Sequence, residues 1–153
     1  MPASDFNDFY AQACEALDLR PVALVKDDRG ERAFTISWRG ADVSFTERTI
    51  GMDERVSIAV RFGAPPADKA LDILRHLMGT SYQMMSEGAS FVMSPRTGVI
   101  YLHSQTSLSG FHVPGLRSML DEFAGQLERW NTDYFLGARR QAHRAELNAS
   151  LFA

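Results

Sequence analysis

In three runs between residues 34 and 62 the apolar side chains recur at every second position, and this period is the strongest constraint on the fold. Phe34, Ile36 and Trp38 alternate with polar residues, and so do the apolar residues of 43–46 and 56–62. Successive side chains of a β-strand point to opposite faces, so each run predicts a strand with one buried face. The turn-forming sequence Arg-Gly-Ala-Asp between the first two runs favours an antiparallel meander.

Three other segments repeat their apolar residues at the helical period of about 3.6. The first predicted helix covers about 5–18 and ends before Pro21, because proline cannot continue a helix. The second covers about 67–78, with Gly79 as its expected C-terminal stop. The third begins at Pro114 and carries a long apolar stripe.

A further hairpin is predicted from residues 91–93 and 99–105, joined by the turn sequence Ser-Pro-Arg-Thr-Gly. The run 22–25 forms a marginal strand ahead of the meander. Residues 80–88 fit a loop, a helix extension or a strand equally well.

These elements predict an α+β domain with the order α-β-β-β-β-α-β-β-α, in which the first strand is marginal. We expect a mostly antiparallel, twisted sheet with the helices packed on one face. Residues 1–131 form one domain, and 132–153 are predicted to be a C-terminal extension or a peripheral helix.

Composition narrows the function classes. The 153 residues carry a net charge of −3, which argues against nucleic acid as a partner because such binding needs a concentrated basic surface. The one cysteine, Cys14, forms no intramolecular disulfide and fits a reducing compartment. No signal-peptide pattern and no run of about 18 apolar residues is visible, so we expect a cytoplasmic protein without membrane insertion.

The sequence contains no recognisable catalytic, metal or cofactor motif. The histidines are His76, His103, His112 and His143, and none has a second ligand at metal-binding spacing. Nucleophile elbows and phosphate-binding glycine loops are also absent from the sequence. We therefore expect no enzyme, no cofactor and no metal.

Apolar residues nevertheless exceed what one core needs. In the second helix Leu71, Leu74 and Met78 form one stripe, and Ile73 and Leu77 widen it beyond a single face. The first helix carries three aromatic residues within five positions. Apolar surface that a small domain cannot cover marks an interface, so the sequence predicts a protein-binding module.

The segment MSPRTGVIYLHSQTSLSGFHVPGLRSMLDEFAGQLERW, residues 93–130, resembles the C-terminal half of the class I type III secretion chaperones, the CesT-like (Tir chaperone) family. In that family a short strand, an Asp-Pro-x-x-Gly turn, an apolar strand and a Leu-rich helix ending near tryptophan follow each other. Here Ser94 replaces the acid of the turn. The aromatic first helix, the strand with Trp38 and the proline-led second helix fit as well, so the resemblance covers about 4–131.

The resemblance implies a non-enzymatic, cytoplasmic homodimer that binds the extended N-terminal segment of a secreted effector and keeps it soluble and secretion-competent. By the same resemblance, the second helix forms the two-fold interface, while the first helix and the sheet contact the effector. The implied dimer residues are Leu71, Leu74, Leu77, Met78 and Tyr82. The implied effector-binding residues, among which the sequence does not separate core from groove, are Phe6, Phe9, Tyr10, Phe34, Ile36 and Trp38.

Two alternatives remain open at this point. A stress-associated or regulatory protein-binding dimer of the same fold would have no role in secretion, because fold alone does not fix function. A small enzyme could assemble a site from scattered residues such as His103, Tyr101 and Asp53.

Overall fold

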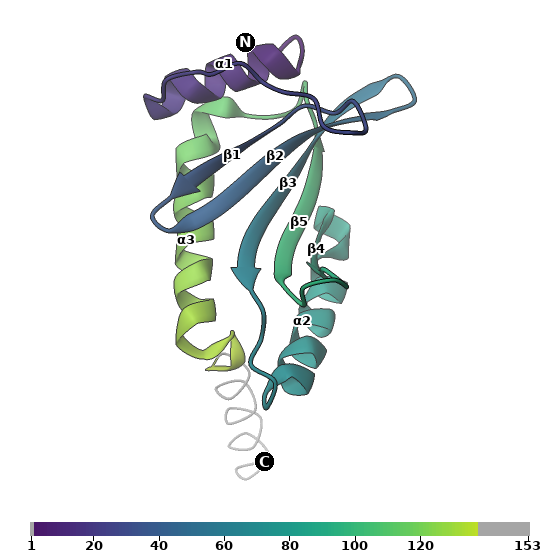
Figure 1. The fold of residues 1–153 in the computed structure, drawn as a ribbon, viewed down its shortest axis with the longest axis vertical. Coiled ribbons are helices and arrows are strands. Elements are labelled where there is room, and N and C mark those ends of the chain that lie inside the picture. The colour runs from purple at the N-terminus through teal and green to yellow at the C-terminus, as the bar shows by residue number, and fades with distance from the viewer. Residues whose placement is uncertain (1, 138–153) are drawn as a thin grey trace, which may run out of the picture.

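The computed structural model describes residues 2–137, which form an open sheet flanked by three helices (Figure 1). The predicted C-terminal extension beyond residue 137 lies outside the described residues. The helices are α1 (Phe6–Leu17), α2 (Ala70–Met84) and α3 (Leu116–Asp133), with short 3₁₀ turns η1 (Met85–Glu87) and η2 (Val113–Gly115). The strands are β1 (Ala33–Trp38), β2 (Ala41–Ile50), β3 (Asp53–Gly63), β4 (Ala89–Met93) and β5 (Ile100–Ser107).

The strands form one five-stranded antiparallel sheet in the order β1-β2-β3-β5-β4. Both predicted hairpins and the predicted α+β class are therefore confirmed. The marginal strand at 22–25 does not form, because this stretch meets the sheet only through an isolated bridge between Lys26 and Arg32. β1 and β4 are thus the two edges of the sheet.

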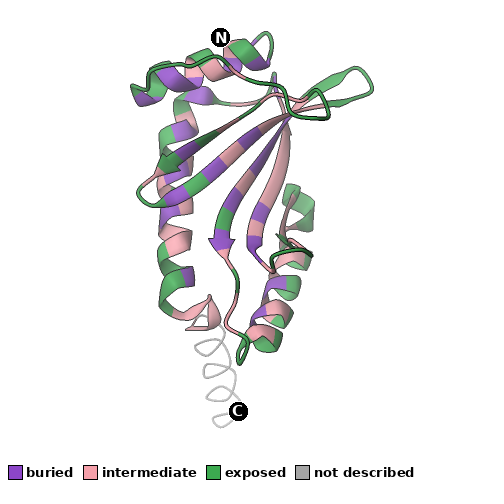
Figure 2. Ribbon diagram, viewed as in Figure 1, coloured by how far each residue is buried: buried purple, intermediate pink, exposed green. Residues whose placement is uncertain are grey.

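One face of the sheet carries the core, as the alternating apolar pattern predicted (Figure 2). Val56, Ile58 and Val60 of β3 lie on this face and are buried. Buried residues of all three helices join the same cluster, among them Phe9 of α1 and Leu120 of α3. α3 lies along β1, β2 and β3, whereas α2 lies beside β4. The other face carries mostly polar residues, among them Ser57, Arg61 and His103.

α1 begins where the sequence predicted. The side chain of Asp5 accepts a hydrogen bond from the backbone N–H of Asp8 at 2.8 Å, which caps the helix. At the other end Asp18 adopts the left-handed conformation with φ 56°. The helix therefore covers 6–17, close to the expected 5–18.

α2 differs from its prediction at both ends, since it begins at Ala70 and continues through Gly79 to Met84. A glycine ends a helix when it takes the left-handed conformation, and Gly79 stays helical. Tertiary contact with β4 supports the extra turn: the Ser81 hydroxyl accepts a hydrogen bond from the Phe91 N–H at 2.8 Å. This bond also occupies an outward-facing donor on the β4 edge.

Candidate docking surfaces

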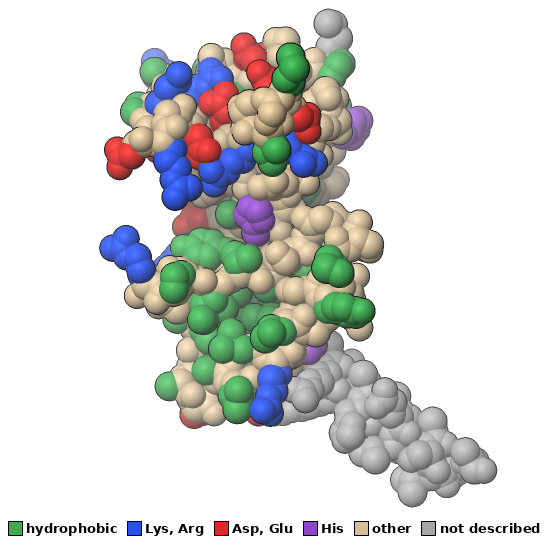
Figure 3. Space-filling view, turned by 90° about the vertical axis from the view of Figure 1, so that its right-hand side faces the viewer, with side chains coloured by type: hydrophobic (Ala, Val, Ile, Leu, Met, Phe, Trp, Pro, Cys, Tyr) green, Lys and Arg blue, Asp and Glu red, His purple; other side chains and the backbone are tan. Residues whose placement is uncertain are grey.

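Apolar side chains on α2, and on the strand that follows it, face outward. Met78 and Tyr82 are 73% and 77% exposed, and Leu71 and Met85 are also exposed. Figure 3 shows hydrophobic side chains gathered on the side of the molecule where α2 and β4 lie. We call this the α2 surface; its exposed residues are Leu71, Met78, Tyr82, Met85, Val92 and Met93.

A groove of about 530 Å³ runs between α2 and β4 within the α2 surface. Met78, Tyr82 and Met85 line its helical side, and Ala89 and Phe91 line the strand side. A concave, largely apolar groove next to flexible methionine side chains can accept a hydrophobic side chain from another polypeptide.

The structure separates the predicted dimer residues into two groups. Leu71, Met78 and Tyr82 are exposed and available for contact. Leu77 is buried in the core of its own subunit, and Leu74 packs against that core while partly exposed. Three further apolar residues of the surface, Met85, Val92 and Met93, were not among the predicted dimer residues. Met85 lies in the ambiguous stretch 80–88, and the apolar strand 91–93 gave no signal of which face it would expose.

A second groove, of about 280 Å³, lies at the opposite edge of the sheet beside β1. Its wall is formed by α1 through Tyr10 and Cys14, and by β1 through Phe34 and Ile36. Residues 19–22 close the outer side. We call this the β1 groove. Sequence reasoning assigned 19–25 to a linker and a marginal strand, so Leu19 and Val22 were missed as groove residues.

The predicted effector-binding residues also divide between core and groove. Phe6 and Phe9 are 1% and 0% exposed and belong to an aromatic core with Phe45 and Phe111. Tyr10 is partly exposed, with its ring 4.7 Å from that of Phe34 between centroids.

The remaining predicted residues lie on β1. Ile36 is buried although it lines the groove, and Phe34 is partly exposed. Trp38, at the end of β1, does not line the groove and contacts α3. Its indole N–H donates to the Asp121 carboxylate at 2.8 Å, and the Arg117 guanidinium lies over its ring.

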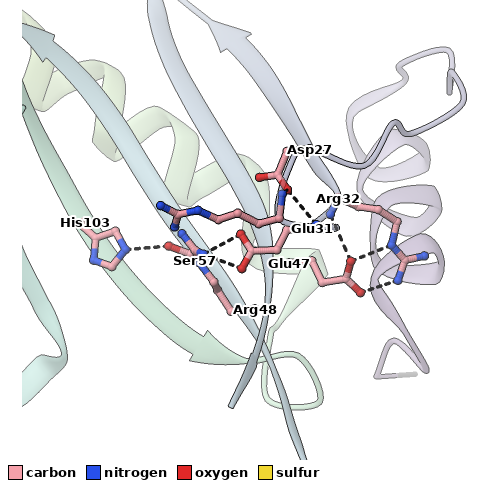
Figure 4. Close-up of polar contacts among 8 residues, drawn as sticks. Asp27, Glu31, Arg32, Glu47, Arg48, Ser57 and His103 are labelled. Atoms are coloured by element: carbon pink, nitrogen blue, oxygen red, sulfur yellow. Dashed lines mark hydrogen bonds and ion pairs between the residues drawn. The ribbon is translucent and has the colours of Figure 1, made fainter. Parts of the chain in front are cut away.

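Two ion pairs fasten the turn at 27–31 and its neighbour Arg32 to β2 (Figure 4). Arg48 donates to both carboxylate oxygens of Glu31 at 2.6 Å, and Arg32 forms a two-point contact with Glu47. Because Glu47 and Arg48 are neighbours on a strand, the two pairs lie on opposite faces of the sheet. The hydrogen bonds from Arg32 hold the pKa of the Glu47 carboxyl below its usual range.

On the polar face, the Ser57 hydroxyl and the His103 Nε2 lie 2.7 Å apart (Figure 4). Burial, and then the positive charge of Arg48, lowers the pKa of His103. Tyr101 pairs with Arg61, eight residues along β3 from Asp53, which corresponds to a separation of about 27 Å at the rise of an antiparallel strand. The scattered residues considered for an enzyme are therefore not gathered into one site.

Residues 2–137 contain no group of three or more histidine, cysteine or acidic side chains that could hold a metal ion. Over the same residues, no helix combines the length and hydropathy that crossing a bilayer requires.

The similarity of this chain to known proteins is seen in its structure and not in its sequence. No family model matches the sequence, and no curated protein matches it. A chain of the ExsC–ExsE complex superposes with a TM-score of 0.58 at 17% identity, covering 82% of this chain and 93% of that one. A chain of the HopA1–SchA chaperone–effector complex superposes with a TM-score of 0.55 at 14% identity, covering 82% and 91%. The chain therefore has the fold that its sequence resemblance implied, that of the class I type III secretion chaperones.

Proposed function

We propose that this protein is a homodimeric, cytoplasmic chaperone that binds the extended N-terminal segment of a type III secretion effector and keeps it soluble and secretion-competent. The observation that carries the proposal is a pair of uncovered apolar surfaces, one at each edge of a sheet whose fold occurs in a chaperone–effector complex. Exposed apolar patches of this kind mark interfaces.

The α2 surface suits a two-fold contact between identical subunits. In such a contact the same patch faces itself, so each apolar side chain is used twice. Met78 and Tyr82 project from one helix face beside the groove, where the partner's side chains can enter. The acidic residues of this stretch, Asp72 and Glu87, lie in the first turn of α2 and in η1, so the part of the patch around Met78 and Tyr82 carries no acidic side chain.

The β1 groove suits the client. β1 is an edge strand, so the backbone groups on its outer side can pair with an added strand. The opposite edge is less open to such pairing, because Ser81 of α2 already caps Phe91 there. An extended client would place alternate apolar side chains against Tyr10 and Phe34 and offset the entropy of ordering by burying them.

Holding a client in this way needs no nucleotide and no chemistry on the client. The chaperone lowers the free concentration of an aggregation-prone segment by mass action, and it releases that segment when a stronger partner competes. The Ser57–His103 pair, on the polar face, lies away from the apolar face that would hold the client. We assign it a structural role.

A pair of matched variants tests the proposal. Leu19 is exposed in the β1 groove and Leu71 is exposed on the α2 surface, so either can be changed to aspartate without opening the core. Each variant is co-expressed with the N-terminal segment of a secreted effector encoded beside it. Leu19→Asp should lose the soluble complex and keep the dimer mass, whereas Leu71→Asp should weaken the dimer.

Two results would contradict the proposal. If neither variant changes client solubility or subunit mass, the two surfaces are not interfaces. If the protein is a dimer that solubilises no secreted effector but captures a cytoplasmic regulator, the stress-associated or regulatory role of the same fold is correct.

A further inference from the structure

Residues 22–26 run back beside the outer edge of β1 without joining the sheet. A tight turn connects them to β1: the Asp27 carboxylate accepts from the backbone N–H groups of Arg29 and Glu31 at 2.9 Å, and Gly30 takes a positive φ of 76°. The Asp27 N–H also donates to the Glu31 carbonyl at 2.7 Å. The ion pairs of Glu31 and Arg32 with β2 hold this turn in place, so residues 22–26 can move only about its fixed position; we call the turn the hinge.

The hinge sets the register of any further pairing. Lys26 and Arg32 form an antiparallel bridge. In an antiparallel ladder the partners change by one residue in opposite directions, so continuing the bridge places Leu24 opposite Phe34 and Val22 opposite Ile36. Both pairs would lie on the core face of the sheet. Leu24 already packs against the core cluster.

The backbone of β1 is arranged to accept this pairing. The Glu47 N–H donates to the Arg32 carbonyl at 2.8 Å, which fixes the alternation of the β1–β2 ladder. Residues 34, 36 and 38 therefore bond to β2, and the N–H and C=O groups of Ala33 and Thr35 point to the outer edge. In the continued register these two residues face Val25 and Ala23.

In the structure the segment stands off from this edge. The Val22 N–H donates to the Tyr10 hydroxyl at 3.0 Å, and the β1 groove of about 280 Å³ separates 19–22 from the strand. Val22 and Val25 are 70% and 80% exposed, which is unusual for two valines in a stretch of strand-forming sequence. The segment is thus tethered at both ends and unpaired between them.

We propose that residues 22–26 are an intramolecular edge strand that can close along β1 in the register set by Lys26 and Arg32, and that an extended peptide must displace it to bind there. This inference rests on the proposed function for the identity of the displacing peptide. Because the segment presents aliphatic residues two apart, Val22 and Leu24, the peptide that replaces it carries aliphatic side chains at the same spacing. The closed strand protects the edge from aggregation when no client is bound.

Disulfide trapping tests the register without any client. Ala23 and Thr35 are exposed and would face each other in the closed state, so Ala23→Cys/Thr35→Cys places two thiols at bonding distance. The matched control, Ala23→Cys/Ala33→Cys, is two residues out of register. Both carry Cys14→Ala. In a glutathione buffer we expect an effective thiol concentration about tenfold or more higher for the register pair. Equal values would overturn the register.

Hydrogen exchange then tells strand pairing from simple proximity. Oxidation of the register pair should slow exchange of the amide of residue 35 about tenfold or more, because its outward N–H gains the carbonyl of residue 23 as a partner, while the Phe45 amide in the sheet interior stays unchanged. A disulfide that forms without protecting the amide of residue 35 would mean that the segment swings against the edge without pairing, which overturns the proposal.

Displacement is measured with a synthetic peptide of the chain's own residues 20–27 as the probe. The probe should bind Ala23→Pro, in which the segment cannot pair fully, about tenfold or more tighter than the oxidised register pair. Equal binding would refute displacement. Since none of these three experiments uses an effector, a failure here leaves the proposed chaperone function standing, and failure of that function leaves the trapping result unaffected.

Discussion

Met78→Asp is the sharpest test of the dimer, because it changes the α2 surface and leaves the core intact. The Met78 side chain is 73% exposed, whereas Leu74 contributes to its own subunit's core and a charge there would also disturb folding. Aspartate is tolerated on an exposed helix face. The free energy of unfolding of the isolated subunit should therefore stay within about 0.5 kcal/mol of the parent's, whereas the stabilisation that comes from dimerisation is lost.

The magnitude follows from the exposed fraction. Complete burial of a methionine side chain stabilises by about 1.5–3 kcal/mol, so burying the exposed part of Met78 contributes about 1–2 kcal/mol per subunit. A two-fold contact uses it twice, which gives about 2–4 kcal/mol and a loss of dimer affinity of at least about thirtyfold. Desolvation of the aspartate adds to this loss.

Sedimentation equilibrium over a range of protein concentrations measures the effect. The matched control is Met52→Asp, which makes the same substitution at the fully exposed tip of the β2–β3 hairpin, away from α2. The parent and Met52→Asp should dimerise alike, and Met78→Asp should be monomeric at micromolar concentration. A dimer of unchanged affinity in Met78→Asp would refute the assignment of the α2 surface, and a monomeric parent would refute the dimer itself.

Three further predictions concern the fold. Phe9→Ala empties a fully buried site among aromatic rings and should cost about 3–5 kcal/mol in urea unfolding, while a loss below about 1 kcal/mol would contradict the packing. Trp38→Phe removes the indole donor to Asp121 and should cost about 1 kcal/mol by the same method, with Asp121→Asn losing little more when combined with it. Burial disfavours the charged form of His103 and lowers its pKa, so the unfolded state binds a proton more readily than the folded state. The free energy of unfolding should therefore fall as the pH drops below about 6.5. His103→Gln should show a smaller fall between pH 7 and 5, and an identical pH profile would refute the linkage.

The sheet was predictable because its signal is local. Alternation along 34–38, 43–46 and 56–62 reflects one buried face, and that face is the one carrying Ile58 and Val60 in the structure. The cap at Asp5 and the stop before Pro21 are likewise set by neighbouring residues. Element order, and through it the resemblance to a chaperone fold, followed from these local signals.

The sequence-based predictions were wrong where contacts between residues far apart in the chain decide the secondary structure. Gly79 reads as a helix stop, but contact between Ser81 and β4 carries the helix five residues further. The run 22–25 has strand-forming residues, yet a strand needs a partner, and the bond from Val22 to Tyr10 holds the segment away from β1.

Residue type therefore determined which segments are helices and strands and that apolar side chains are in excess, because both depend on local period and on composition. Only the tertiary structure decided that Phe9 and Leu77 are enclosed while Tyr10 and Met78 remain accessible. Neighbours on one helical stripe have the same hydrophobicity, and their burial depends on how far the opposing strand or helix extends over them, which is set by packing between segments far apart in the chain.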